Sequence, residues 1–310
     1  MTESQSHPAD HIGICIPTFK RPKLLRRLLF AVSRQDTGGL FFYSVHVIDN
    51  DPMRSAETTV LECARTASVR ITYEVEPIQN IAMARNRALQ SAEGNFIAFV
   101  DDDEVPGDNW LLTLYLACRQ YRVDGVLGPV RPLFGLDAPL WLKESGLCDR
   151  PSHESGTVLN HLQTRTGNVL FQRRILDEVP TPFPPEKGRT GGEDIEFFRR
   201  MIARGCSFRW CAEAPVFEQV TPDRYKREYY FAKALRIGGL TGEMLRNGGT
   251  GRWPAAIQSC CAAVVHMATG TAEFIVRDYS HVQHAVKLAY HVGRICGCLG
   301  IVPVRYRPET

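Results

Sequence analysis

The chain has 310 residues, of which 44% are hydrophobic and 23% are charged. This composition is ordinary for a globular protein with a sizeable core and excludes a chain that is disordered throughout. Lys and Arg number 37 against 34 Asp and Glu, a balance that argues against nucleic acid as a partner. The charge is uneven, because residues 1–220 hold 25 basic and 28 acidic residues and residues 221–310 hold 12 and 6. The last third therefore predicts a surface that meets phosphates or anionic lipid.

The 10 cysteines do not indicate a disulfide framework. Residues 1–10 lack the basic and apolar regions of a secretory signal peptide, so we expect a cytoplasmic, reducing environment. No two cysteines have the C-x-x-C spacing of a zinc site. Reduced cysteine packs as a small hydrophobic residue, and free, buried thiols are the expected state.

Short apolar runs alternate with segments of helical periodicity from residue 12 onward. The first helical segment begins at Pro22, a residue favoured at a helix start. Strands are expected over residues 12–17, 43–49, 70–76 and 96–101, and further helices over residues 55–65, 81–92 and 109–121. This alternation indicates βαβ units and an α/β fold with a mostly parallel, Rossmann-like sheet flanked by helices.

The sequence becomes irregular after about residue 131, where prolines interrupt it repeatedly. Long loops in a compact domain are often lids or binding loops. A short helix is expected over residues 194–204, entered through Gly191 and Gly192, and from Arg224 onward the chain is predicted to be helical.

Two nucleotide-binding motifs are missing from the sequence. Neither G-x-G-x-x-G nor G-x-x-x-x-G-K-[ST] occurs, which argues against a nicotinamide dehydrogenase and a P-loop ATPase. Ligands of open α/β sheets bind beyond the carboxyl ends of the strands. Those ends carry acids here, namely Asp49 after the second strand and residues 101–104 (Asp-Asp-Asp-Glu) after the fourth.

The acids at residues 101–104 predict a cation site. In an extended segment Asp101 and Asp103 point to the same side and Asp102 points to the other. Two hard carboxylates suit Mg²⁺ or Mn²⁺, which complete their coordination with phosphate oxygens and water. The ligand implied is a diphosphate, and a solvated acidic turn is the structural alternative.

A second acidic cluster follows two glycines at residues 191–194 (Gly-Gly-Glu-Asp). Glycine pairs allow a tight turn or a close approach of the backbone to a ligand. Acids at a helix start are also favoured by the helix dipole and by capping. A carboxylate at this position can accept the proton of an attacking hydroxyl as a general base, so a structural and a catalytic role both stay open.

Five motifs, in this order, resemble those of family 2 glycosyltransferases. They are residues 16–21 (Ile-Pro-Thr-Phe-Lys-Arg), residues 80–86 (Asn-Ile-Ala-Met-Ala-Arg-Asn), residues 101–103, residues 192–194 (Gly-Glu-Asp) and residues 215–224 (Pro-Val-Phe-Glu-Gln-Val-Thr-Pro-Asp-Arg). The last motif, followed by residues 229–238, is similar to the subgroup that makes bacterial exopolysaccharides such as succinoglycan. The resemblance covers about residues 10–240.

The resemblance implies a GT-A domain over residues 11–240. A disordered tail over residues 1–10 would precede it, and a helical C-terminal extension over residues 241–310 would follow it. The implied reaction is transfer of a sugar, with inversion at the anomeric carbon, from a nucleotide diphosphate sugar to a glycan or lipid-linked acceptor in bacterial polysaccharide biosynthesis. A UDP-sugar is the favoured donor, and Mn²⁺ or Mg²⁺ is the expected cofactor.

The resemblance also implies roles for individual residues. Asp194 would be the catalytic base, with Glu193 orienting the acceptor or the base itself. Asp101 and Asp103 match a D-x-D motif and would hold the metal that bridges the two phosphates. Donor contacts are implied for Pro17, Thr18, Arg21, Asp49, Arg85, Asp102, Arg224, Lys233 and Arg236. The last three would replace the positive charge of a Gln-x-x-Arg-Trp motif, which is absent here, and a solvated helix face is the alternative for them.

Residues 254–272 contain no Asp, Glu, Lys or Arg. The stretch is long enough to span a membrane but too rich in small and polar residues to do so, so we expect a buried or interfacial helix. Basic residues on both sides would hold an interfacial helix to an anionic leaflet. These are Arg246, Arg252, Arg277, Lys287 and Arg294. The prediction is peripheral contact with the cytoplasmic face of the inner membrane, and packing in a core or a dimer interface is the alternative.

Two other functions stay open. A nucleotidyltransferase on a similar fold would activate a sugar phosphate, but its usual glycine-rich basic loop after the first strand is missing. A non-catalytic sugar-binding protein would keep the fold without the chemistry. The presence of Asp101, Asp103, Glu193 and Asp194 argues against that alternative.

Overall fold

The computed structural model describes residues 10–188, 191–247, 252–275 and 279–301. The chain forms two compact units, of which the first comprises Met1–Arg131 with Arg150–Gln219 and the second comprises Pro132–Asp149 with Val220–Thr310. The expected GT-A domain over residues 11–240 with a helical extension over residues 241–310 stays a prediction. Of the expected N-terminal tail, residues 1–9 lie outside the described residues, and Asp10 already belongs to the first strand.

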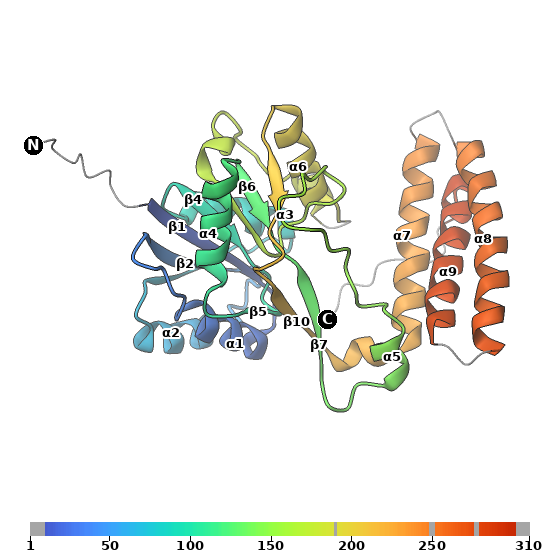
Figure 1. The fold of residues 1–310 in the computed structure, drawn as a ribbon, viewed down its shortest axis with the longest axis horizontal. Helices are drawn as coiled ribbons and strands as arrows, with labels where there is room; N and C mark the ends of the chain where they lie inside the picture. Colours follow the sequence, from blue (N-terminus) through green and yellow to red (C-terminus); the bar gives the residue numbers. More distant parts are fainter. Residues whose placement is uncertain (1–9, 189–190, 248–251, 276–278, 302–310) are drawn as a thin grey trace, which may run out of the picture. The chain divides into compact units, whose positions relative to one another are not determined.

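The first unit is built on strands β1 (Asp10–Thr18), β2 (Phe41–Asp49), β3 (Ile71–Val75), β4 (Phe96–Phe99), β6 (Gly125–Leu127), β8 (Val169–Gln172) and β9 (Phe208–Trp210). They form one sheet in the order β3-β2-β1-β4-β8-β6-β9. Figure 1 shows this sheet with β1, β2, β4 and β6 labelled. β8 runs antiparallel to β4 and β6, and the other neighbouring pairs are parallel. The mostly parallel sheet expected from the sequence is confirmed.

Helices cover both faces of this sheet. They are α1 (Pro22–Val32), α2 (Glu57–Thr66), α3 (Ile81–Ser91), α4 (Trp110–Tyr121) and α6 (Glu193–Ala203). Alternate residues of β1 point to opposite faces, so Ile14 and Ile16 pack in a core cluster with α1, α2 and α4, whereas Cys15 packs in the other with α3 and α6. Burial of one such aliphatic side chain contributes about 1.5–3 kcal/mol, and the two clusters hold the helices to the sheet.

The carboxyl ends of β1, β2 and β4 lie at the same edge of the sheet, because these strands are parallel neighbours. Thr18, at the end of β1, is paired with Asp49, at the end of β2. Cys15 of β1 is paired with Phe99 of β4, so the chain that leaves β4 emerges beside the end of β1. This is the edge at which ligands of open α/β sheets bind.

Three short strands form a second sheet. They are β5 (Glu104–Pro106), β10 (Val216–Val220) and β7 (Val130–Phe134), in the order β5-β10-β7. β10 is antiparallel to β5 and sets Glu218 opposite Glu104. The sequence predicted only loops in most of this region, because strands of 3 to 5 residues carry too little periodicity to be recognised without their partners.

The second unit is helical, as predicted for the chain after Arg224. It contains α5 (Leu140–Glu144), a 3₁₀ turn at Pro222–Tyr225, α7 (Arg227–Asn247), α8 (Arg252–Ile275) and α9 (Ser280–Leu299). Further 3₁₀ turns, in the first unit, lie at Arg173–Leu176 and Pro185–Lys187. The α5 segment belongs to the second unit because Leu142 and Cys148 form a buried cluster with Val220 and Tyr230. None of the described helices is both long and apolar enough to cross a membrane.

The backbones of α7 and α9 touch (Figure 1). A Cβ atom added to Gly242 would lie 2.1 Å from the carbonyl oxygen of Arg294, and one added to Gly297 would lie 2.1 Å from that of Gly239. Any side chain at these glycines would therefore push the two helices apart.

The cysteines are free, as expected. Cys15 and Cys148 are among the buried ones, but Cys260 and Cys261 of α8 are exposed. The expectation of burial is therefore wrong for these two, because they lie on a face of α8 that no described residue covers.

Candidate active site

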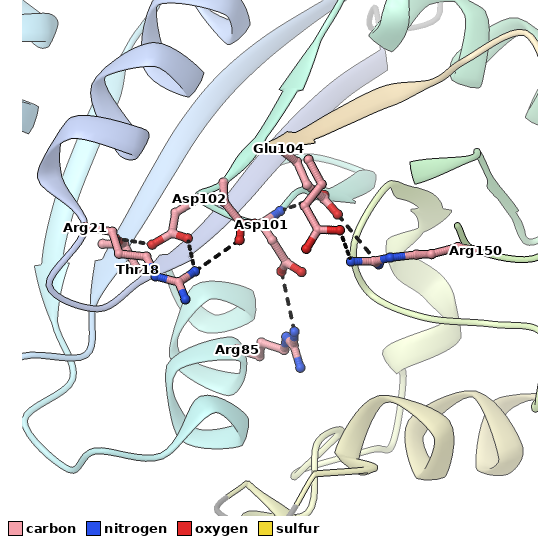
Figure 2. Close-up of polar contacts among 9 residues, drawn as sticks. Thr18, Arg21, Arg85, Asp101, Asp102, Glu104 and Arg150 are labelled. Carbon is pink, nitrogen blue, oxygen red and sulfur yellow. Dashed lines mark hydrogen bonds and ion pairs between the residues drawn. The ribbon is translucent and has the colours of Figure 1, made fainter. Parts of the chain in front are cut away.

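Residues 101–104, the acidic turn, follow β4 at the edge where the strands end. The amide of Glu104 donates a hydrogen bond of 3.0 Å to the carbonyl oxygen of Asp101. The extended geometry expected for Asp101 and Asp103 is therefore wrong, because a hydrogen-bonded turn takes the place of the strand. The side chains of Asp101 and Asp102 point toward different partners (Figure 2).

One side of the acidic turn binds residues from the end of β1. Thr18 Oγ1 donates a 2.8 Å hydrogen bond to Asp102 Oδ2. Arg21 Nη1 lies 3.2 Å from Asp102 Oδ1 and 3.2 Å from Asp103 Oδ2, and its side chain is half exposed. The structure thus brings together three residues for which donor contacts were expected, Thr18, Arg21 and Asp102, and adds Asp103 to them.

The acidic turn concentrates negative charge. The pKa of Asp103 is raised to about 7, because the side chain is desolvated and the charges of Asp101 and Asp102 disfavour a further one. Desolvation also raises the pKa of Asp102. A bound cation would offset this repulsion, since a positive charge favours the ionised form of each carboxylate.

Arg85 connects the acidic turn to α6. Its Nη1 donates a hydrogen bond to Glu193 Oε1, and its Nη2 lies 3.5 Å from Asp101 Oδ1. Only 7% of Arg85 is exposed. The residue is carried by α3, whose first turn is capped by the Asn80 side chain accepting hydrogen bonds from two backbone amides. Asp101 and Glu193 therefore share one guanidinium, and contact of Arg85 with a donor stays a prediction.

Glu193 and Asp194 open α6 directly after Gly191 and Gly192. Both glycines have positive φ angles, 93° and 90°, which other residues rarely adopt. Glu193 is 5% exposed, and its burial raises its pKa despite the neighbouring guanidinium. Asp194 is less buried, and its Oδ1 accepts a 2.8 Å hydrogen bond from the amide of the next residue. Asp194 is the accessible carboxylate of the pair.

Arg150, which the sequence reasoning missed, lies on another side of the acidic turn (Figure 2). Its Nη2 is 2.7 Å from Glu218 Oε2 and its Nη1 is 4.0 Å from Glu104 Oε1. Glu104 is fully buried, burial raises its pKa well above the usual value, and its Oε1 has no hydrogen-bond partner among the described residues. No motif could reveal Arg150, because Glu104 and Glu218 meet only through the pairing of β5 with β10.

Two residues for which nucleoside or donor contacts were expected are buried at the same edge. Asp49 is fully buried, and its Oδ2 accepts hydrogen bonds from the amide of Ala56 (2.8 Å) and the hydroxyl of Tyr73 (2.9 Å). Asp49 thereby holds the loop between β2 and α2. Pro17 is buried on β1, paired with Ile48 of β2. Their contact with a donor stays a prediction.

The three basic residues expected at the diphosphate belong to the second unit. Arg224 precedes α7, and its Nη2 is 4.0 Å from Cys148 Sγ. Lys233 and Arg236 lie on α7, where Lys233 Nζ is 5.8 Å from the centroid of the Tyr229 ring. These contacts are made within the second unit, and a role of the three residues at the diphosphate stays a prediction.

The acidic turn offers ligands of the right kind for a divalent cation. Asp101 and Asp103 provide carboxylate oxygens, and Mg²⁺ usually keeps several positions for water and phosphate. Gly167 leaves room beside them, since a Cβ atom there would lie 3.1 Å from Asp101 Oδ2 and 2.7 Å from Glu104 Oε1. Within the described ranges, no group of three or more His, Cys, Asp or Glu side chains forms a complete metal site. A cation at this turn would have to take part of its coordination from a substrate and from water.

The sequence matches a known protein family. The sequence model of glycosyl transferase family 2 matches residues 13–183. The chain belongs to glycosyl transferase family 2. This family 2 glycosyltransferase is 31% identical over 304 residues to the succinoglycan biosynthesis protein ExoM of Rhizobium meliloti (strain 1021), with 94% of each chain covered. It is also 23% identical over 244 residues to the chondroitin synthase of Pasteurella multocida (strain Pm70), covering 69% of this chain and 25% of that protein.

Solved structures share the fold of the glycosyltransferase. The mannosyltransferase PcManGT from Pyrobaculum calidifontis, in complex with GDP-Man and Mn²⁺, has a TM-score of 0.60 at 16% identity, covering 94% of this chain and 88% of that chain. TarS 1–349 of S. aureus, in complex with UDP-GlcNAc, has a TM-score of 0.53 at 16% identity, covering 94% and 92%. The expected GT-A fold and the resemblance to the succinoglycan subgroup are confirmed. Family membership also favours sugar transfer over a nucleotidyltransferase or a non-catalytic binding protein.

Proposed function

We propose that this glycosyltransferase moves a sugar from a UDP-sugar to a hydroxyl of a polysaccharide or lipid-linked acceptor, with inversion at the anomeric carbon and with Mn²⁺ or Mg²⁺ as cofactor. The observation that carries the proposal is the Arg85 bridge. One buried guanidinium joins Asp101 of the proposed cation site to Glu193, which is next to the accessible Asp194. A carboxylate that can take a proton is thereby held at a set position relative to carboxylates that can bind a cation.

The compared proteins support the class of acceptor and donor. ExoM is named for succinoglycan biosynthesis and the Pasteurella protein for chondroitin synthesis, and polysaccharide synthesis is the function we assign by analogy. TarS was solved with UDP-GlcNAc and PcManGT with GDP-Man. Because one fold accommodates both nucleotides, the test below compares donors.

In the proposed reaction the acceptor hydroxyl attacks the anomeric carbon from the face opposite the diphosphate. Asp194 accepts the hydroxyl proton as the new C–O bond forms. The bond from the anomeric carbon to the diphosphate oxygen breaks and leaves its electron pair on the diphosphate, so negative charge builds up there. Asp101 and Asp103 would hold a divalent cation, which would supply Lewis-acid neutralisation of this charge. Glu193 and Arg85 keep the start of α6 in position.

Release of nucleoside diphosphate by the purified protein tests the proposal. UDP-, GDP- and dTDP-sugars are incubated in turn with Mn²⁺ or Mg²⁺ and a membrane extract as the source of acceptor. We expect turnover with a UDP-sugar and loss of turnover when EDTA removes the metal. Absence of turnover with every donor contradicts sugar transfer, and turnover that EDTA leaves unchanged contradicts the cofactor assignment.

Asp194→Asn tests the base. Asn has nearly the same size but accepts no proton, so kcat should fall about 10²- to 10⁴-fold, while donor affinity measured by calorimetry should not change. Glu196→Gln is the matched control, because Glu196 lies in the same helical turn and pairs with Arg199 at 2.6 Å. Full activity of Asp194→Asn would show that another group takes the proton.

We also assign α8 to the cytoplasmic face of the inner membrane. One face of this helix carries six apolar side chains that are each more than half exposed, namely Trp253, Ile257, Val264, Met267, Phe274 and Ile275. An exposed apolar face of this length is unusual on a monomeric protein. Residues 221–310 hold 12 basic against 6 acidic residues, an excess that suits anionic lipid. Of the flanking basic residues, Arg277 and the side chain of Arg252 lie outside the described part of the chain.

Sedimentation of the full chain with vesicles tests this assignment. We expect it to pellet with vesicles of phosphatidylglycerol and phosphatidylethanolamine more than with phosphatidylcholine alone, and the double change Val264→Glu and Phe274→Glu should weaken binding about tenfold or more. Met53→Glu alters an even more exposed apolar residue of the first unit and should have no effect. Absence of vesicle binding refutes the assignment. If the protein is a dimer that the double change dissociates, the apolar face of α8 is a contact between two copies of the chain and the assignment is also refuted.

A further inference from the structure

A segment of the first unit passes directly against the acidic turn. Residues 164–168 lead into β8 and end at Asn168, which is fully buried and has a φ of 61°. Its Nδ2 donates hydrogen bonds to the carbonyl oxygens of Pro129 (2.9 Å) and Ala214 (2.8 Å), and its Oδ1 accepts one from Trp110 Nε1 (2.7 Å). These bonds hold the segment in one conformation.

Gly167 brings this segment into contact with the carboxylates. An added Cβ atom at Gly167 would lie 2.7 Å from Glu104 Oε1 and 3.1 Å from Asp101 Oδ2, so no larger residue fits without displacing them. The other residues of the segment are buried, except Arg165, which is partly exposed. Arg165 is therefore the residue through which the segment can meet a ligand beside the acidic turn.

The charges that surround Arg165 are those of the proposed site. Burial, together with the positive charge of Arg150, lowers the pKa of Arg165, and the charges of Asp194, Glu104 and Glu218 oppose this shift. The guanidinium thus lies in the field of both the acidic turn and the proposed base. Because arginine stays protonated in proteins, Arg165 is a permanent positive charge in a partly desolvated position.

Arg165 differs from the other arginines of the site in its partners. Arg21, Arg85 and Arg150 each pair with a carboxylate. Arg165 makes no hydrogen bond or ion pair with any residue in the described part of the chain. Desolvation of a charge is unfavourable unless a partner compensates it, so this position suits an anion brought by a ligand.

We propose that Arg165 binds the diphosphate of the donor and holds it as the leaving group. The inference rests on the proposed sugar transfer. The planar guanidinium matches two phosphate oxygens at once, and its charge would add to that of a divalent cation bound at the acidic turn. Arg165 belongs to the same unit as Asp101, so this charge is in place whatever the second unit contributes.

Calorimetric titration along a nucleotide series tests the proposal. A thermal-shift screen with Mn²⁺ first identifies which of UDP, GDP and dTDP binds. Wild type, Arg165→Gln and Arg165→Lys are then titrated with the nucleoside, monophosphate and diphosphate of that base. We expect Arg165→Gln to bind the diphosphate about 10- to 100-fold more weakly with unchanged affinity for the nucleoside, and Arg165→Lys to recover part of the loss.

Arg65→Gln is the matched control, because Arg65 is an exposed arginine in the last turn of α2 in the same unit. It should bind the diphosphate like wild type, and Arg165→Gln should unfold at the wild-type temperature because no partner is lost. Equal diphosphate affinity of wild type and Arg165→Gln overturns the role of Arg165 while leaving sugar transfer intact.

Two other results also overturn the proposal. An effect of Arg165→Gln that is confined to the KM of the acceptor would place the residue at the acceptor, and a lowered unfolding temperature with equal loss of nucleoside binding would make its role structural. Failure of the wild type to bind any of the three diphosphates overturns both this proposal and the proposed function.

Discussion

The two units of this glycosyltransferase differ in the kinds of groups that they bury. The first buries charge, with Arg85 7% exposed, Glu193 5% exposed and Glu104 fully buried. The second buries bare backbone, where α7 and α9 meet at Gly242 and Gly297. Buried ion pairs add little net stability compared with apolar residues of similar size, so we infer that the first unit keeps its charges for the geometry they impose. A helical bundle needs only complementary shape, whereas a site for charged substrates needs oriented charge away from water.

Removal of Arg85 should give the largest effect on stability. Arg85→Met leaves the carboxylates of Asp101 and Glu193 without their counter-charge, and breaking a buried pair in this way lowers the free energy of unfolding by about 3–5 kcal/mol. Urea denaturation measures the loss. The control is Arg87→Met on the same helix, because Arg87 forms a more exposed pair with Glu74 at 3.1 Å, a kind worth about 0–1 kcal/mol. Equal losses of unfolding free energy in Arg85→Met and Arg87→Met would show that burial gives the Arg85 pair no special importance for stability.

A smaller loss is expected where the second unit brings two helices together. Gly242→Ala places a methyl group 2.1 Å from the backbone carbonyl oxygen of Arg294, and such overpacking costs about 1–3 kcal/mol. Thermal unfolding followed by circular dichroism at the helical band reports it. Met244→Ala, at an exposed position of the same helix, should change stability by no more than about 0.5 kcal/mol. Alanine is a better helix former than glycine. A gain in stability of Gly242→Ala would therefore mean that α7 and α9 do not touch at this position.

The smallest effect is a pH dependence that comes from a buried neutral group of the first unit. Burial lowers the pKa of His46 on β2 to about 4, below the value of about 6.5 for an unfolded chain. Between these values the unfolded chain binds a proton that the folded chain does not, so the contribution of His46 is present above pH 6.5, about the unfolded pKa, and is lost as the pH falls toward 4.

Urea denaturation at pH 7 and pH 5 measures this dependence. His46→Gln removes the titrating group and should reduce the fall in the free energy of unfolding by about 1–2 kcal/mol. His161→Gln, in a turn of the same unit, serves as the control. The same fall in wild type and His46→Gln would show that the histidine is not held neutral by burial.

Local patterns in the sequence predicted the first unit well up to residue 121. The helices and strands there have periodic apolar residues, and the motifs singled out Thr18, Arg21 and Asp102, which the structure joins by hydrogen bonds. Prediction from local patterns fails at the end of β4. A run of apolar residues predicts the strand, but no local pattern shows that a turn closes from Asp101 to Glu104.

The remaining parts of the site lay in segments without motifs. Arg150 and Arg165 occur in loops, and their neighbours in the sequence give no sign of the carboxylates near them. The glycines of α7 and α9 also look ordinary until the two helices are seen together. Periodicity reports which face of an element is buried, but it does not report which element covers that face.

The order of the βαβ units, the acids at the strand ends and the motifs that indicate the family could be predicted from the sequence, because each depends on residues that are close together in the chain. Which carboxylate each arginine neutralises could not be predicted in this way. Arg85 meets Glu193 across 108 positions and Arg150 meets Glu218 across 68. Pairing over such separations depends on strand register and on burial, and both arise only when the whole unit has folded.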